Sequence, residues 1–194
     1  MYAYLDGRLA YKSATYVIID VNGVGYQVLI SLHTFSNLPE GERCKLYTWL
    51  HVKEDGHTLY GFSEEGERRL FLHLISVSGI GPNTARMILS SASPADSQQA
   101  IIRGDVPLIQ RIKGIGGKTA QRLVLELQDK LKKDGPDSLI TAPQAASAKD
   151  EAITALTLLG FTKPAVEKVI NEILTQHPGS LTVEQLIKFA LKRL

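Results

Sequence analysis

The chain has 194 residues, enough for one large or two to three small domains, and a formal net charge of +2. Its single cysteine, Cys44, excludes an internal disulfide and fits a reducing cytosol. Apolar runs are far shorter than the ~20 residues of a membrane-spanning helix and no signal peptide is recognisable, so we expect a cytoplasmic protein without a membrane partner. The five histidines are scattered without metal-ligand spacing, so we expect no metal and no other cofactor.

Residues 1–62 carry the alternation and turn signals of β-structure. Asn22 and Gly23 form a two-residue hairpin signal between two runs of β-branched and aromatic residues. A short helix is expected over Leu32–Leu38, before a turn at Pro39. The predicted strands are Leu5–Tyr11, Tyr16–Val21, Val24–Ile30, Cys44–Val52 and Thr58–Phe62. Short strands with one small helix indicate a closed barrel of the OB type, and an SH3-like barrel is the alternative.

The last two strands are joined by the turn Lys53–Gly56, which contains Glu54 and Asp55. Acidic residues and glycine are favoured in turns. No complementary histidine or lysine arrangement would make the two carboxylates a catalytic pair. By itself, this acidic turn predicts no chemistry.

From Ser63 the hydrophobic period changes from that of a strand to that of a helix, and residues 63–135 read as a compact helical domain. The predicted helices are Glu64–Val77, one from Ser93-Pro94 to about Gly104, Val106–Lys113 capped by Asp105, and a last one that ends near Lys133.

This helical domain contains an internal repeat, in which Leu74–Leu89 aligns with Ile109–Val124. Gly79-Ile80-Gly81 (the first hairpin) falls on Gly114-Ile115-Gly116 (the second hairpin), and a Thr-Ala pair follows each. Apolar residues flank both copies at helical spacing, so each copy predicts a helix, a tight turn and a second helix.

The chemistry of such a turn follows from its parts. Glycines allow a positive φ and a close approach to a ligand, while the middle isoleucine can point inward. The second helix then presents unpaired N–H groups and the positive end of its dipole, which together favour a phosphate. Such a contact reads no base, so the paired copies predict sequence-independent DNA binding. The alternative is a plain αα-hairpin whose glycines only cap a helix. Between residues 78 and 122, six cations face two acids: Arg86, Arg103, Arg111, Lys113, Lys118 and Arg122 against Asp96 and Asp105.

The segment Gly114–Thr119 looks like part of a nucleotide-binding P-loop, but Ile112 stands where the motif needs its first glycine. The residues before it are helical rather than a buried strand. We therefore expect no ATP binding here.

Residues 136–148 lack periodicity and predict a flexible linker. Residues 149–194 predict a separate bundle, in which Thr182 and Gln185 have capping-box spacing. Its predicted helices are about Asp150–Leu159, Lys163–Gln176 and Val183–Arg193. Leu156, Leu159, Phe161 and Leu191 are candidates for both the core and an exposed patch. A small bundle on a tether suits the recruitment of another protein.

The order of barrel, paired hairpins, linker and helical tail closely resembles the RuvA family, the Holliday-junction-binding subunits of bacterial branch-migration machinery. The resemblance covers the whole chain. Its most specific parts are Asn22–Tyr26, Lys53–Asp55 with Leu59–Phe62, both hairpins, and Ala155–Phe161.

The resemblance implies a homotetramer, sometimes doubled to an octamer, that holds four-way junction DNA open during recombination and repair. It implies DNA contacts through Gly79, Gly81, Asn83, Arg86, Gly114, Gly116, Gly117, Lys118 and Arg122. The family often has a lysine where Asn83 and Gly117 stand, so two side-chain phosphate contacts are absent here. Glu54 and Asp55 match the family's acidic pin, which separates strands at the crossover.

The tail resembles the domain that binds RuvB, an ATP-driven motor, with Leu156, Leu159, Phe161 and Leu191 at matching positions. The junction resolvase RuvC is a further implied partner. On this reading the chain itself catalyses nothing, because the motor hydrolyses the ATP.

Two alternatives use the same motifs. A DNA glycosylase or nuclease would need a catalytic pocket or clustered acidic metal ligands, whereas Asp96 and Asp105 are isolated and suit helix starts. A single-strand binder working through its barrel would need exposed aromatic residues, and Tyr47, Trp49 and Tyr60 are either these or core.

Overall fold

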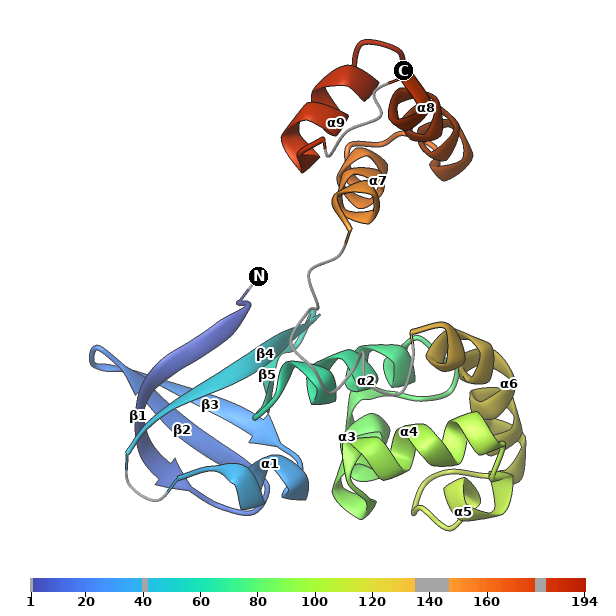
Figure 1. The fold of residues 1–194 in the computed structure, drawn as a ribbon. Coiled ribbons are helices and arrows are strands. Elements are labelled where there is room, and N and C mark those ends of the chain that lie inside the picture. Colours follow the sequence, from blue (N-terminus) through green and yellow to red (C-terminus); the bar gives the residue numbers. More distant parts are fainter. Residues whose placement is uncertain (1, 40–41, 135–146, 177–180) are drawn as a thin grey trace. The chain divides into compact units, whose positions relative to one another are not determined.

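A computed structural model describes residues 2–39, 42–134, 147–176 and 181–194 of the chain (Figure 1). The chain divides into two compact units, Met1–Ala142 and Pro143–Leu194, and each is described by itself. None of the described helices is long and apolar enough to cross a membrane.

The first unit begins with a closed five-stranded barrel, which confirms the predicted OB type. Its strands, in the order in which they close, are β1 (Tyr4–Lys12), β2 (Tyr16–Val21), β3 (Val24–Ile30), β5 (Gly56–Phe62) and β4 (Arg43–Lys53). Neighbours are antiparallel except β3 and β5, which run parallel. Asn22 and Gly23 form the tight β2–β3 turn with positive φ angles of 51° and 90°, which the Asn-Gly pair tolerates. The short helix α1 (Leu32–Asn37), capped by Ser31, connects β3 to β4.

Helices α2 to α6 follow the barrel in the same unit. They are α2 (Glu65–Ile75), α3 (Pro82–Ser91), α4 (Pro94–Arg103), α5 (Val106–Gln110) and α6 (Gly117–Asp134). The predicted caps are present, because the Ser93 side chain accepts from Asp96 N–H, the Asp105 side chain accepts from Leu108 N–H, and Gly104 ends α4 in the left-handed region. The helix predicted to reach Lys113 ends at Gln110, where the chain turns into the second hairpin.

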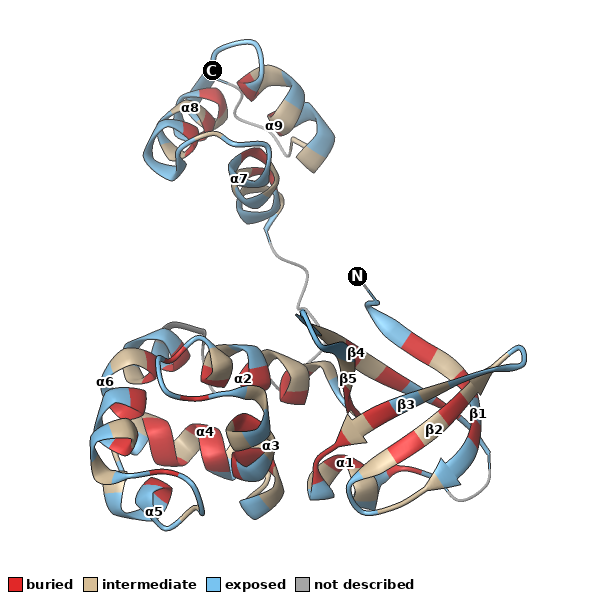
Figure 2. Cartoon of the chain, turned by 180° about the vertical axis from the view of Figure 1, so that it is seen from behind, coloured by how far each residue is buried: buried red, intermediate tan, exposed pale blue. Residues whose placement is uncertain are grey.

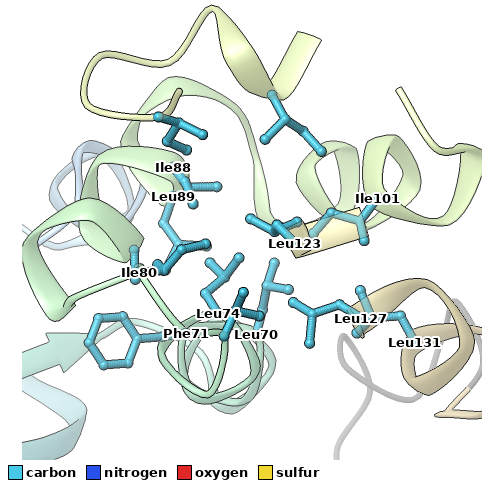
Figure 3. Packing of buried hydrophobic residues seen from close by; sticks show 14 of the residues in the cluster. Leu70, Phe71, Leu74, Ile80, Ile88, Leu89, Ile101, Leu123, Leu127 and Leu131 are labelled. Carbon is cyan, nitrogen blue, oxygen red and sulfur yellow. The ribbon is translucent and has the colours of Figure 1, made fainter. Parts of the chain in front are cut away.

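These helices surround a core of buried side chains from every helix of the domain (Figures 2 and 3). Leu70 and Leu74 of α2 lie between Leu89 of α3 and Leu123 of α6, and Phe71 points away from Leu123 (Figure 3). The two halves of the repeat therefore share one core, which holds both hairpins to a common scaffold.

An aromatic cluster joins the barrel to the helices. Phe71 of α2 has ring centroids of Trp49, Tyr60 and Phe62 within 4.9–5.5 Å. Tyr60 is buried, and Trp49 and Tyr47 pack half-buried against the helical core. These rings are therefore structural and do not form the exposed stacking platform that a single-strand binder would need.

A buried carboxylate forms a second connection. Glu67 of α2 accepts hydrogen bonds from the Ser31 hydroxyl and, at 2.6 Å, from the Thr34 hydroxyl of α1. Each hydroxyl also accepts a backbone N–H, that of Thr34 and that of Ser63 respectively. Burial raises the pKa of Glu67, although the hydrogen bonds from Ser31 and Thr34 and the nearby His33 oppose the shift.

The Glu67→Gln variant is expected to become more stable relative to the wild type as pH rises. The raised pKa of Glu67 means that its contribution to stability is complete below its ordinary value of 4.5 and is lost as pH rises through the folded-state pKa. Glutamine cannot ionise, so the difference in unfolding free energy between variant and wild type should grow from about pH 4.5 upward. Denaturant titrations at several pH values measure this difference. Glu64→Gln, at an exposed neighbour, is the control, and a pH-independent difference for Glu67→Gln would contradict the assignment.

The second unit is a three-helix bundle of α7 (Ala148–Leu158), α8 (Lys163–Gln176) and α9 (Val183–Ala190). The predicted capping box is present at Thr182 and Gln185. Of the predicted linker 136–148, residues 136–146 lie outside the described residues, and Ser147 caps α7 through Asp150 N–H. The bundle core consists of Ala152, Leu156, Val166, Ile170, Ile173, Leu186 and Ala190.

Candidate nucleic-acid interface

The two hairpins have the same backbone geometry. Gly79 and Gly114 adopt φ angles of 91° and 92°, a conformation that a side chain would strain. The middle residues Ile80 and Ile115 are only 4% and 5% exposed, so each anchors its turn in the core as predicted. The repeat in the sequence is therefore a repeat of conformation.

Each second helix begins in the same way. The N–H of Ala85 donates to the Gly81 carbonyl at 3.0 Å, and the N–H of Ala120 donates to the Gly116 carbonyl at 2.9 Å. No side chain caps α3, whose N-cap is Gly81. A Cβ atom built on Gly81 or Gly116 would meet nothing within 4 Å, so the approach to the helix start is open. This arrangement leaves main-chain amides available to an anion.

The two hairpins lie side by side. A Cβ atom on Gly79 would stand 3.9 Å from the Cγ2 atom of Thr119, which is in the first turn of α6. The first hairpin therefore lies close to the start of the helix that follows the second hairpin, which brings the two helix starts into one region. Two neighbouring phosphate sites suit a sugar-phosphate strand better than either would alone.

Two cations of the predicted site flank the second hairpin. Lys118 is exposed at the start of α6, and Arg122 lies one turn later on the same face. Arg122 forms a long ion pair of 3.7 Å with Glu126, and both side chains are substantially exposed. Such a pair contributes little and leaves the guanidinium able to reach a phosphate.

Arg86 has a structural position that the sequence did not predict. Its Nη1 atom donates to the Thr15 carbonyl at 2.9 Å and the Ile30 carbonyl at 3.5 Å, both in the barrel region. Nη1 therefore has partners within the protein, and a DNA contact through the rest of the guanidinium stays a prediction. Its charge is committed to two carbonyls of the same unit.

Asn83 and Gly117 stand where the family often carries lysine. Asn83 is exposed, but its Oδ1 atom accepts a hydrogen bond of 3.2 Å from the Tyr60 hydroxyl. A Cβ atom on Gly117 would lie 3.5 Å from Gln110 Nε2, an ordinary contact. Position 117 can therefore accept a side chain, whereas position 83 already has a partner.

The acidic turn projects from the barrel. Glu54 and Asp55 connect β4 to β5 beyond the last ladder pair, Lys53 with Gly56, and both carboxylates are exposed. Among the described residues neither has an ion-pair partner. They are free to act on a partner through their charge.

In the tail, the structure separates core from surface. Leu156 is fully buried, so its prediction as a partner contact is wrong, because the bundle core needs it. Phe161 is half-buried against the same core. Leu159 is 63% exposed, Leu191 is also exposed, and Leu158, which was not predicted, is 83% exposed. Two adjacent leucines at a helix end cannot both face one core, and this was the signal for Leu158.

Within the described residues, no three His, Cys, Asp or Glu side chains are grouped to hold a metal ion. A closed barrel joined to tandem helix-hairpin-helix motifs, with open helix starts on one surface, defines a DNA-binding protein of the helix-hairpin-helix class. Family models match the chain as RuvA N terminal domain over residues 1–61, SAM-like helix-hairpin-helix tandem over 71–129 and RuvA C-terminal domain over 147–194.

Relatives match over the full length. The chain is 52% identical to a protein of Cytophaga hutchinsonii over 99% of both chains, and 50% identical to proteins of Christiangramia forsetii and Flavobacterium psychrophilum over 100% of each. All three are named Holliday junction branch migration complex subunit RuvA. The chain therefore belongs to the RuvA family.

Proposed function

We propose that this protein binds four-way junction DNA independently of sequence and acts as the non-catalytic DNA-binding subunit of a branch-migration complex. The observation that carries the proposal is the pair of equivalent hairpins, side by side, with unobstructed helix starts. Phosphates are present in every DNA sequence, and main-chain amides recognise them without reading bases. Family membership supports the junction as the preferred target.

A homotetramer fits the geometry of this target. A junction has four equivalent arms, so four copies of one subunit give each arm the same pair of phosphate sites. The acidic turns would meet at the crossover, where eight carboxylates from Glu54 and Asp55 would repel the phosphates of exchanging strands. Repulsion between like charges is stronger in such a constricted centre than on an open surface.

The division of labour follows the chain order. Residues 1–62 supply the acidic turn, residues 63–135 grip the arms, and residues 149–194 recruit a RuvB-type ATPase across the linker 136–148. This places the complex in recombination and DNA repair, with the motor supplying the ATP hydrolysis.

An electrophoretic mobility shift at moderate salt tests the proposal, with an immobile four-way junction, a matched linear duplex and a single strand as competing ligands. We expect strong preference for the junction and no cleavage when Mg²⁺ is present. Preference for the single strand would support a barrel-based binder instead, and cleavage would support a nuclease.

The Gly117→Lys variant is expected to tighten junction binding several-fold and to steepen its salt dependence. Position 117 has room for a side chain and stands at the start of α6, where a lysine reaches the same phosphate as the helix. Each added phosphate contact raises the slope of log affinity against log salt by about 0.9. Parallel salt titrations with Gly117→Gln, which has similar length and no charge, separate the charge from the added surface. Equal slopes for the lysine and glutamine variants would contradict the prediction.

Replacing Leu158 and Leu159 by serine is expected to abolish motor-driven branch migration and to leave DNA binding unchanged. Both leucines are exposed at the end of α7, where their apolar side chains can be buried only by a partner. Branch migration with an added RuvB-type ATPase measures the first effect, and a mobility shift measures the second. Thr175→Ala, at an exposed position of α8, is the control. Normal motor-driven branch migration with the double variant would show that the motor binds another surface.

A further inference from the structure

The strand that leaves the acidic turn is bonded directly to the helix that follows the first hairpin. Strand β5 begins at Gly56, and its Tyr60 is 4% exposed, with the ring packed on Trp49 and Phe71. The Tyr60 hydroxyl donates to Asn83 Oδ1, near the start of α3. Burial raises the pKa of Tyr60, so the hydroxyl keeps the proton that it donates.

Two more side chains of α3 make bonds to the region around the barrel. Arg86 donates to the carbonyls of Thr15 and Ile30, and the Ser90 hydroxyl accepts the backbone N–H of Leu32 at 3.1 Å. Residues 83, 86 and 90 recur at helical spacing, so they lie on one face of α3. This face is attached to the barrel along most of the length of the helix.

The second hairpin has no such attachment. Gln128 of α6 donates to the Ile102 carbonyl at 2.8 Å, a contact within the helical domain. Among the described residues of the first unit, α6 forms no hydrogen bond to the barrel. The equivalent of Asn83 in the repeat is Lys118, which is exposed.

We propose that Tyr60, Asn83 and Arg86 are positioning residues that set the first hairpin relative to the acidic turn before DNA binds. This inference rests on the proposed junction binding and assigns these residues a role other than phosphate contact. At position 83, this chain has an asparagine that bonds to Tyr60 in place of a lysine that would contact DNA. We call the hydrogen bonds made by Tyr60, Asn83 and Arg86 the lock, because they connect the first hairpin to the barrel that carries the acidic turn.

The lock matters more for a junction than for a linear duplex. A duplex needs only the hairpins, whereas a junction requires hairpins and acidic turns of all subunits to fit one branched ligand together. Pre-organisation lowers the ordering cost of such a fit. Loosening the lock therefore reduces selectivity for the junction and leaves duplex affinity nearly unchanged.

The experiment compares Tyr60→Phe, Asn83→Ala and the double variant with wild type. Tyr60→Phe removes one hydroxyl and keeps the ring, and Tyr47→Phe, in the same sheet, is the matched control. In the free protein, amide hydrogen exchange should accelerate several-fold in residues 79–86 and stay unchanged in 114–121, the equivalent hairpin in the same molecule.

With DNA, the ratio of junction to duplex affinity should fall about three- to tenfold in each single variant, the effect of one lost hydrogen bond. The double variant should lower this ratio no further than either single variant does, because both substitutions remove the same hydrogen bond. Unchanged exchange in the first hairpin, an equal loss of both affinities, or additive losses would overturn the inference. The exchange measurement needs no DNA, so its outcome does not depend on whether the protein binds junctions. If the proposed function is wrong, the wild-type protein will bind the junction no more tightly than the duplex.

Discussion

The double variant Gly81→Asp/Gly116→Asp is expected to lose junction binding by about 100-fold or more while remaining folded. Both glycines precede a helix, and neither has a positive φ. A Cβ atom at either position would enter open space, so the side chain is accommodated. Two like charges about 4 Å apart repel each other by ~4 kcal/mol at a surface dielectric of ~20. A repulsion of this size corresponds to a loss of affinity of more than about 100-fold. Each carboxylate would stand at a proposed phosphate site.

Stability separates this effect from misfolding. Aspartate is a favourable N-cap residue, a few tenths of a kcal/mol better than glycine, so the melting temperature should stay equal or rise slightly. Fluorescence anisotropy with a labelled junction measures the affinity. Gly81→Asn/Gly116→Asn, of the same shape without the charge, should bind far better than the aspartate variant. Equal loss with asparagine would indicate a steric effect, and unchanged binding with aspartate would remove the hairpins from the interface.

Neutralising the acidic turn with Glu54→Gln/Asp55→Asn is expected to keep or tighten junction binding and to impair strand separation. Both carboxylates are exposed, so their replacement costs the fold little. In the proposed tetramer the change would remove eight negative charges from the crossover, and their repulsion of phosphates would disappear with them. Affinity and opening should therefore change in opposite directions.

A junction with 2-aminopurine at the crossover measures both quantities, because the fluorescence of this base rises when it unstacks. We expect the variant to show tight binding with a smaller fluorescence rise and slower motor-driven migration. Glu42→Gln, which neutralises another exposed carboxylate of the barrel, should behave as wild type. A loss of binding in the neutralised variant would assign the acidic turn an attractive role instead.

Local signals predicted much of the fold. Asn22-Gly23 specified the β2–β3 turn, Ser93-Pro94 and Asp105 specified helix starts, and Gly104 a helix end. The hairpins were predictable because each depends on glycine chemistry and on one apolar residue within three positions. Such short-range interactions can be predicted because the residues that make them are close together in the sequence.

Interactions between distant segments were not predictable. Glu67 reads as one of several acids at a helix start, yet it accepts hydrogen bonds from the hydroxyls of Ser31, which caps α1, and Thr34. Arg86 reads as a phosphate ligand because its charge is visible in the sequence, while the barrel carbonyls that accept its bonds are not. Leu156 and Leu158 differ only in which side of α7 meets the bundle, which the three-helix packing decides.

Hydroxyl-radical footprinting of a four-way junction tests the central claim most directly. If two adjacent hairpins in each of four subunits hold the backbone, protection should appear as the same short pair of sites on all four arms, and it should vanish with Gly81→Asp/Gly116→Asp. Protection of one arm alone, or an unchanged footprint in that variant, would contradict the account.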